Sequence, residues 1–115
     1  MQVPADVRDR VASILEEAAS ILDTYGWISG GYGDQSNGYC AVGAIAAVPG
    51  CSLLFEEEDR YALRLVAKRV ASIPISTSIV INEEAVLGWN DELGRTLGEV
   101  TDTLRSVAKD LRNES

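Results

Sequence analysis

Apolar residues recur at three- and four-residue spacing through much of this chain, and that periodicity restricts the fold more than any other feature of the sequence. In residues 5–25 the apolar stripe consists of Val7, Val11, Ile14, Leu15, Ala18, Ile21, Leu22 and Tyr25. Such spacing places its members on one face of an α-helix. Pro4 and Asp6 suit a helix start, and Gly26 suits the residue that follows a helix. We therefore predict a helix over residues 5–25.

A glycine-rich stretch follows this helix. Trp27 occupies the position where an apolar side chain can fold back onto the last helical turn, here near Leu22. The next segment, "ISGGYGDQSNG", covers residues 28–38 and has no apolar periodicity. It also lacks the glycine spacing and the following Lys that are typical of phosphate-binding loops. We predict an ordinary loop.

The segment "YCAVGAIAAV", residues 39–48, is apolar on every side and consists mainly of small residues. A helix of this kind belongs at the centre of a domain, where its neighbours can approach closely. The small positions expected at these contacts are Ala41, Gly43, Ala44 and Ala47. Pro49 and Gly50 end the segment.

A third helix is predicted over residues 53–72. Ser52 is a plausible cap, and "EEED" lies near the expected N-terminus, where acidic side chains are favourable. Basic residues follow toward its C-terminus: Arg64, Lys68 and Arg69. The expected buried face consists of Leu54, Tyr61, Leu65, Val66 and Val70.

The segment "STSIVI", residues 76–81, is rich in β-branched side chains and is predicted to be extended. No convincing second strand is present to pair with it, so we predict no sheet. Asn82 is expected to cap a short helix over residues 83–89.

The stretch "WNDELGRTLGEV" predicts a joint between two helices. Thr96 and Glu99 fit a capping box, and Gly94 allows a sharp turn before it. Asp91 and Arg95 are four residues apart and are expected to pair, while Trp89 is expected to close over the joint as part of the core. The last helix then buries Leu97, Val100, Leu104, Val107, Ala108 and Leu111.

These elements predict one all-α domain over residues 1–115, a length that suits a single domain. The prediction comprises four main helices and one short helix, arranged around the small-residue helix, which is one of the four and lies at the centre. A Gly-rich loop and one short extended segment complete the prediction.

The chain has no histidine, which removes the commonest general base and the commonest metal ligand. Cys40 and Cys51 are its only cysteines, and two thiols without histidine do not form a typical zinc site. We therefore expect no metal and no cofactor. Cys40 is predicted to lie in the first turn of a helix, where a nucleophilic thiol could be activated. A cysteine-dependent enzyme is thus an alternative, although the apolar neighbours of Cys40 favour an inert, buried thiol.

With 18 acidic and 10 basic residues, the chain has a formal net charge of −8. This charge disfavours direct contact with nucleic-acid phosphates, and an acidic mimic of nucleic acid is a further alternative. No stretch has the 18 or more consecutive apolar residues of a membrane span, so no membrane association is expected. The N-terminus lacks the pattern of a signal peptide, and a cytoplasmic location is expected.

Three motifs, "GW" after the first helix, "YCAVGAI" and "WNDELGRTLGEV", together resemble an uncharacterised family of small proteins from actinobacteria and their phages. The family is classed as a domain of unknown function, and the resemblance spans residues 10–110. It singles out Cys40, Gly43, Ala44, Trp89, Asn90, Asp91, Gly94, Arg95, Thr96 and Glu99. The resemblance implies no activity, but it favours a phage or prophage accessory protein.

The missing catalytic groups favour a non-enzymatic module that binds another protein. The Gly-rich loop and the joint each precede an apolar helix, the second and the last, so the two segments share one end of the domain if those helices pack side by side. The candidate binding residues there are Tyr32, Asp34, Asn90, Asp91 and Arg95, a mixture that includes the aromatic and Arg anchors typical of interfaces. A structural role is expected for Cys40, Gly43, Trp89, Gly94, Thr96 and Glu99.

Overall fold

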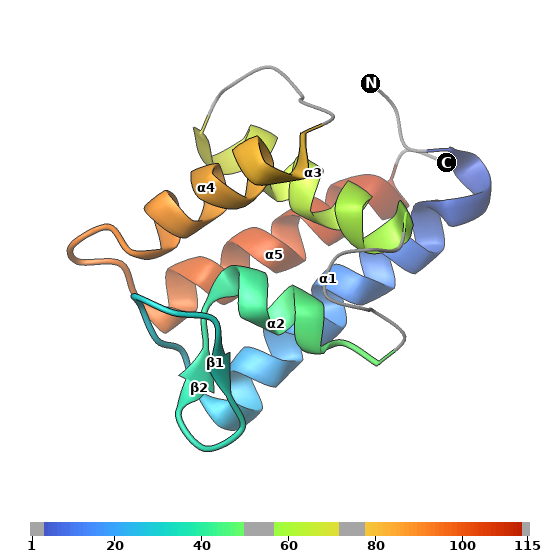
Figure 1. Ribbon diagram of the computed structural model, residues 1–115. Helices are drawn as coiled ribbons and strands as arrows, with labels where there is room; N and C mark the ends of the chain where they lie inside the picture. Colours follow the sequence, from blue (N-terminus) through green and yellow to red (C-terminus); the bar gives the residue numbers. More distant parts are fainter. Residues whose placement is uncertain (1–3, 50–56, 72–77, 114–115) are drawn as a thin grey trace.

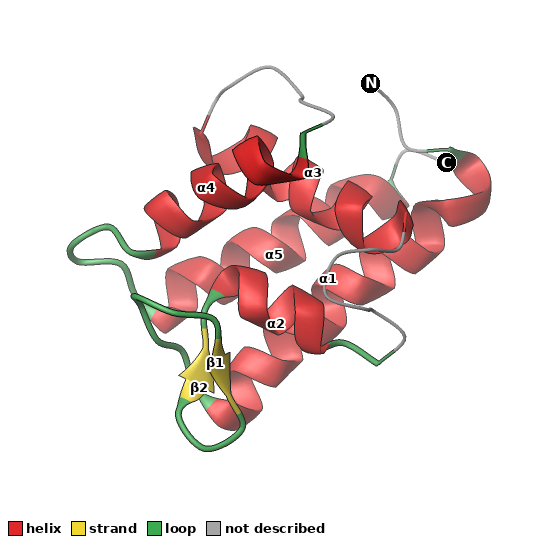
Figure 2. Cartoon of the chain, in the orientation of Figure 1, coloured by secondary structure: helices red, strands yellow, loops and turns green. Residues whose placement is uncertain are grey.

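The computed structural model has five helices and one short hairpin in the part of the chain that it describes, residues 4–49, 57–71 and 78–113 (Figures 1 and 2). The elements are α1 (Ala5–Tyr25), β1 (Gly33–Asp34), β2 (Gly38–Tyr39), α2 (Ala41–Ala47), α3 (Glu57–Ala71), α4 (Ile79–Asn90) and α5 (Leu97–Arg112). The all-α class is confirmed.

The longest helices, α1 and α5, lie antiparallel and side by side (Figure 1). Ion pairs fix their alignment on the surface: Arg105 lies 2.6 Å from Asp23, and Arg112 lies 2.8 Å from Glu16. The hydrogen bond from Arg112 lowers the pKa of the Glu16 carboxyl. Helix α1 has the predicted bounds, and α5 begins directly after the predicted Thr96 cap, because the apolar stripes and the flanking turn residues agree.

The short helix α2 is buried over residues 41–45 and packs against α1, α3 and α4, in agreement with its predicted central position. It is shorter than the predicted 39–48, since Cys40 is its cap and Val48 already has extended backbone. Two expected contacts differ. Ala47 is exposed, and the backbone closest to Gly43 is that of Tyr32 in the Gly-rich loop, not that of another helix.

Helix α3 buries Ala62, Leu63, Val66 and Ala67, whereas the predicted core residues Tyr61, Leu65 and Val70 are only partly buried. The buried face is therefore turned slightly from the predicted one. The predicted cap Ser52 and the predicted core residue Leu54 lie outside the described residues.

The prediction of an extended segment over residues 76–81 is wrong for its last three residues, which form the first turn of α4. Ser78 caps this helix, and its Oγ accepts a hydrogen bond of 3.3 Å from the Ile81 amide. Asn82 is consequently not a cap but a buried residue within the helix. The Ser78 cap and the packing of α4 as a whole against α3 outweigh the local β preference of residues 79–81. Residues 76 and 77 lie outside the described part.

The Gly-rich loop contains a hairpin that the sequence analysis did not predict. Gly33 pairs with Tyr39 and Asp34 with Gly38 in antiparallel register. The carboxylate of Asp34 stabilises the turn, because its Oδ1 accepts hydrogen bonds from the Ser36 and Asn37 amides at 2.9 and 2.8 Å. This is the local bonding by which Asp favours turns.

Candidate functional site

The Gly-rich loop and the joint, residues 89–95, lie together at one end of the molecule, on the left in Figure 1. The amide of Gly30 donates a hydrogen bond of 2.9 Å to Oδ1 of Asp91. The indole Nε1 of Trp27 donates a hydrogen bond of 2.7 Å to Oδ1 of Asn90. Residues separated by about sixty positions are thus joined directly, and the two segments share one end of the domain. The expected cause differs, because α2 packs mainly against α1, α3 and α4 rather than against the last helix.

Asn90 connects three elements from a fully buried position. Its Oδ1 also accepts a hydrogen bond of 2.9 Å from the amide of Ala41, the first residue of α2. Its Nδ2 donates to the Ile28 carbonyl at 3.1 Å. This side chain therefore satisfies an amide at the start of α2 that has no partner within the helix. Asn90 positions the site from within and presents no surface to a partner. The sequence predicts that Trp27 folds back onto the last turn of α1. In the structure, its indole N–H is bonded to Asn90 in the joint.

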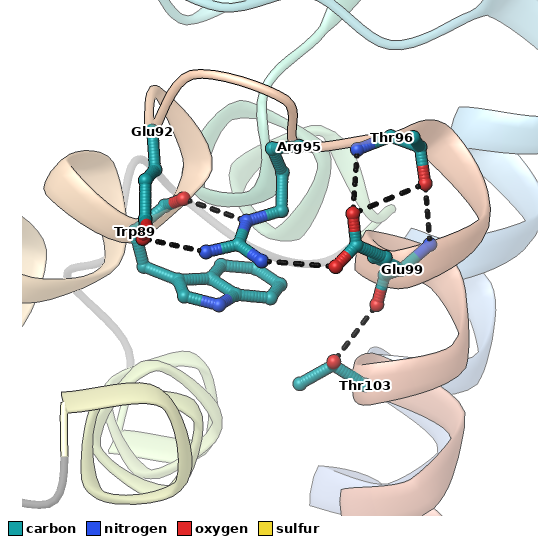
Figure 3. A network of polar contacts seen from close by, with 6 residues as sticks. All are labelled: Trp89, Glu92, Arg95, Thr96, Glu99 and Thr103. Atoms are coloured by element: carbon teal, nitrogen blue, oxygen red, sulfur yellow. Dashed lines mark hydrogen bonds and ion pairs between the residues drawn. The ribbon is translucent and has the colours of Figure 1, made fainter.

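Arg95 is held by four interactions, which Figure 3 shows from close by. Its Nε donates to the Trp89 carbonyl at 2.9 Å, and its guanidinium lies 4.4 Å from the centre of the Trp89 ring. Its two terminal nitrogens pair with Glu92 at 2.8 Å and with Glu99 at 3.1 Å. The Arg95 side chain is only 14% exposed.

The predicted pair between Asp91 and Arg95 is therefore wrong. The carboxylate of Asp91 is bonded instead to the Gly30 amide and to Nδ2 of Asn90. Gly94, which has a φ of 88°, turns the chain so that Arg95 reaches back over Trp89. The spacing of four residues indicates a pair only within a continuous helix, and this helix ends at Asn90.

The capping box at the start of α5 is confirmed. Oγ1 of Thr96 accepts from the Glu99 amide at 3.2 Å, and Oε1 of Glu99 accepts from the Thr96 amide at 3.1 Å (Figure 3). Glu99 therefore both caps α5 and holds Arg95. Within this fixed loop, the side chain of Leu93 is fully exposed to solvent. The sequence analysis missed Leu93, although an apolar residue between Glu92 and Gly94 in a turn was a usable signal.

A shallow cleft of about 230 Å³ separates the two segments. It is lined by Gly30, Gly31, Tyr32, Leu87 and Asp91. Tyr32 is 52% exposed, and Asp91 stands two residues before Leu93. Asp34 is also exposed but belongs to the hairpin turn, where its carboxylate already accepts several hydrogen bonds.

A model of the family of unknown function DUF6197 matches residues 6–110. The chain belongs to this family. No curated protein and no solved structure matches it. The resemblance to a family of unknown function is thereby confirmed, while the origin in actinobacteria or their phages stays a prediction.

In this member of the DUF6197 family, Cys40 is the N-cap of α2. Its Sγ accepts a hydrogen bond of 3.3 Å from the Gly43 amide. The residue is fully buried, and this burial raises the pKa of the thiol. A protonated, buried thiol is a poor nucleophile, so the geometry gives no support to the cysteine-enzyme alternative. Cys51 lies outside the described residues.

Neither a metal centre nor a membrane span is found in the described ranges. No group of three or more Cys, Asp and Glu side chains in residues 4–49, 57–71 and 78–113 could hold a metal ion. None of the helices in the same ranges combines the length and the apolar character needed to cross a bilayer.

Proposed function

We propose that this protein is a non-enzymatic module that binds another protein in the cytoplasm through the joint surface. We define the joint surface as the exposed side chains of Tyr32, Asp91 and Leu93. The observation that supports the proposal is a fully exposed leucine on a loop that Arg95 and Glu99 hold in place. An apolar side chain on an ordered loop gains by burial, and little loop freedom is lost when it binds.

The composition of the joint surface supports a protein partner. Tyr32 contributes an aromatic ring next to the cleft, and aromatic residues are enriched at interface hot spots. Asp91 contributes polar character at the rim, although its Oδ1 is already bonded within the domain. Arg95 and Asn90 fix the shape of this surface from behind.

The second part of the proposal concerns the origin of the gene. It is supported by the motifs that resemble proteins of actinobacteria and their phages. On this proposal the gene is phage-borne, and its product is an accessory protein that acts on a host protein. Sequencing of the surrounding genome tests this part, and a gene set without any phage gene nearby would contradict it.

The test of the binding function is a double substitution, Tyr32→Ala with Leu93→Ser. The tagged protein is used to capture partners from a lysate of its native host, and captured proteins are identified by mass spectrometry. The matched control is Ile81→Ser, which removes another half-exposed apolar side chain at a distance of about 15 Å along α4 from Asp91.

We expect the double variant to lose a partner that the wild type and Ile81→Ser both retain, with the melting temperature unchanged. Equal capture by all three proteins would contradict the proposal. Loss of capture by the control as well would assign binding to a different surface.

A further inference from the structure

A second, larger pocket lies between the hairpin, α2 and α4, with a volume of about 390 Å³. Its lining includes Tyr32, Tyr39, Val42, Gly43, Ala46 and Glu83. Small residues of α2 form much of the lining, and the backbone of Tyr32 closes over Gly43 because no Cβ stands between them. The volume is in the range of sites that hold small ligands or single side chains.

Glu83 gives this apolar pocket its charge. Of the described residues that line the pocket, Glu83 alone is charged. Glu83 is partly buried as a residue, and no hydrogen bond or ion pair engages its carboxylate within residues 4–49, 57–71 and 78–113. A carboxylate beside apolar walls favours a ligand that brings a positive charge, because a neutral or anionic ligand would leave it without a counter-charge. The net charge of −8 favours the approach of a cation as well.

The rest of the lining suits an arginine side chain. Its aliphatic stem can pack against Val42 and Ala46, while tyrosine rings attract a guanidinium group. Val80 precedes Glu83 by three residues on the same side of α4 and is 59% exposed. Val80 can therefore pack against an apolar residue that flanks the arginine in a peptide, a contact that a free amine lacks.

We propose that the pocket binds an arginine side chain of a basic segment of a partner protein, with the guanidinium paired to Glu83. This inference rests on the proposed protein-binding function and adds the chemistry of the partner. The pocket shares Tyr32 with the joint surface, whereas Glu83 and Val80 lie outside that surface.

The probe is the peptide acetyl-Ala-Leu-Arg-Leu-Ala-amide, titrated into the ¹⁵N-labelled protein and followed by NMR. We expect saturable shifts of the backbone amides of Val42, Gly43 and Glu83. Glu83→Gln should weaken binding about tenfold, since a hydrogen bond to a charged group is lost. Glu84→Gln is the matched control, because this neighbouring carboxylate is exposed and does not line the pocket.

A second comparison leaves the protein unchanged. A peptide with citrulline in place of arginine keeps the shape of the side chain and lacks its charge, so it should bind about tenfold more weakly as well. Absence of saturable shifts at the pocket, or equal affinity of the arginine and citrulline peptides, would overturn the inference. Butylguanidine binding as tightly as the peptide would also overturn it, since the site would then serve a free small cation.

The two proposals can fail separately. Loss of a partner through Tyr32→Ala with Leu93→Ser, combined with no binding of the arginine peptide, would refute the pocket inference and leave the proposed function standing. A partner that is captured equally well by Glu83→Gln would likewise refute the inference alone.

Discussion

Replacement of Gly43 by alanine tests how closely the Gly-rich loop packs on α2. A Cβ at this position would lie 2.0 Å from the carbonyl oxygen of Tyr32 and 2.8 Å from its carbonyl carbon. Both atoms belong to the backbone, so the loop itself would have to move. The same carbonyl oxygen accepts a hydrogen bond of 3.1 Å from the Cys40 amide, which that movement would weaken.

The expected change in the free energy of unfolding for Gly43→Ala follows from three contributions. Overpacking costs about 1–3 kcal/mol, and loss of one hydrogen bond costs about 1 kcal/mol. Alanine gains about 1 kcal/mol over glycine within a helix. The net loss for Gly43→Ala is therefore about 1–3 kcal/mol, which corresponds to a fall in Tm of roughly 4–12 °C for a domain of this size.

Gly88 provides the matched control in thermal and urea unfolding followed by circular dichroism. It also lies within a helix, but a Cβ there would meet no atom within 4 Å. Gly88→Ala should therefore raise stability by up to about 1 kcal/mol through helix propensity alone. If Gly43→Ala were as stable as Gly88→Ala, the close contact between the loop and α2 would be refuted.

Three further changes test the joint and the core thiol. Asn90→Ala should lower the free energy of unfolding by about 2–4 kcal/mol, because it leaves the Trp27 indole N–H and the Ala41 amide without their acceptor; a loss below about 1 kcal/mol in urea unfolding would contradict this role. Arg95→Lys should lower the free energy of unfolding by about 1–2 kcal/mol, because a lysine ammonium cannot contact Trp89, Glu92 and Glu99 with the planar geometry of the guanidinium. An unchanged Tm would contradict this expectation. In a Cys51→Ser background, Cys40 should react with a thiol reagent far more slowly in the native protein than after denaturation, because burial raises the pKa of its thiol. Rapid native labelling would revive the cysteine-enzyme hypothesis.

The sequence predicts those elements whose local and long-range preferences agree. Helix α1 and the start of α5 have long apolar stripes and clear end signals, so these bounds could be predicted. The start of α4 could not, because three β-branched residues favour an extended chain locally, whereas the N-cap and the packing of α4 as a whole favour a helix. The Ser78 cap was the local signal that favours the helix.

The hairpin and the joint show a different limit. The strands have only two residues each, too few for an alternating pattern, although the turn sequence Asn37-Gly38 was a usable hairpin signal. The loop and the joint were predicted to share one end through packing of the second helix against the last. They do share one end, but through the hydrogen bonds of Asn90 and Asp91, whereas α2 packs mainly against α1, α3 and α4. The partners of Asn90 and Arg95 could not be predicted, because they depend on where a helix ends and on contacts between distant residues.

Both tryptophans of the chain lie at the joint, Trp89 within it and Trp27 bonded to it, and this makes its opening visible by spectroscopy. The indole of Trp27 is bonded to Asn90, and the ring of Trp89 lies beneath Arg95. Intrinsic fluorescence therefore reports on one end of the molecule, whereas far-ultraviolet circular dichroism reports on all five helices. A fluorescence transition that precedes the dichroism transition would reveal local opening of this end before global unfolding. Coincident transitions would show that the joint and the helical core unfold as one cooperative unit.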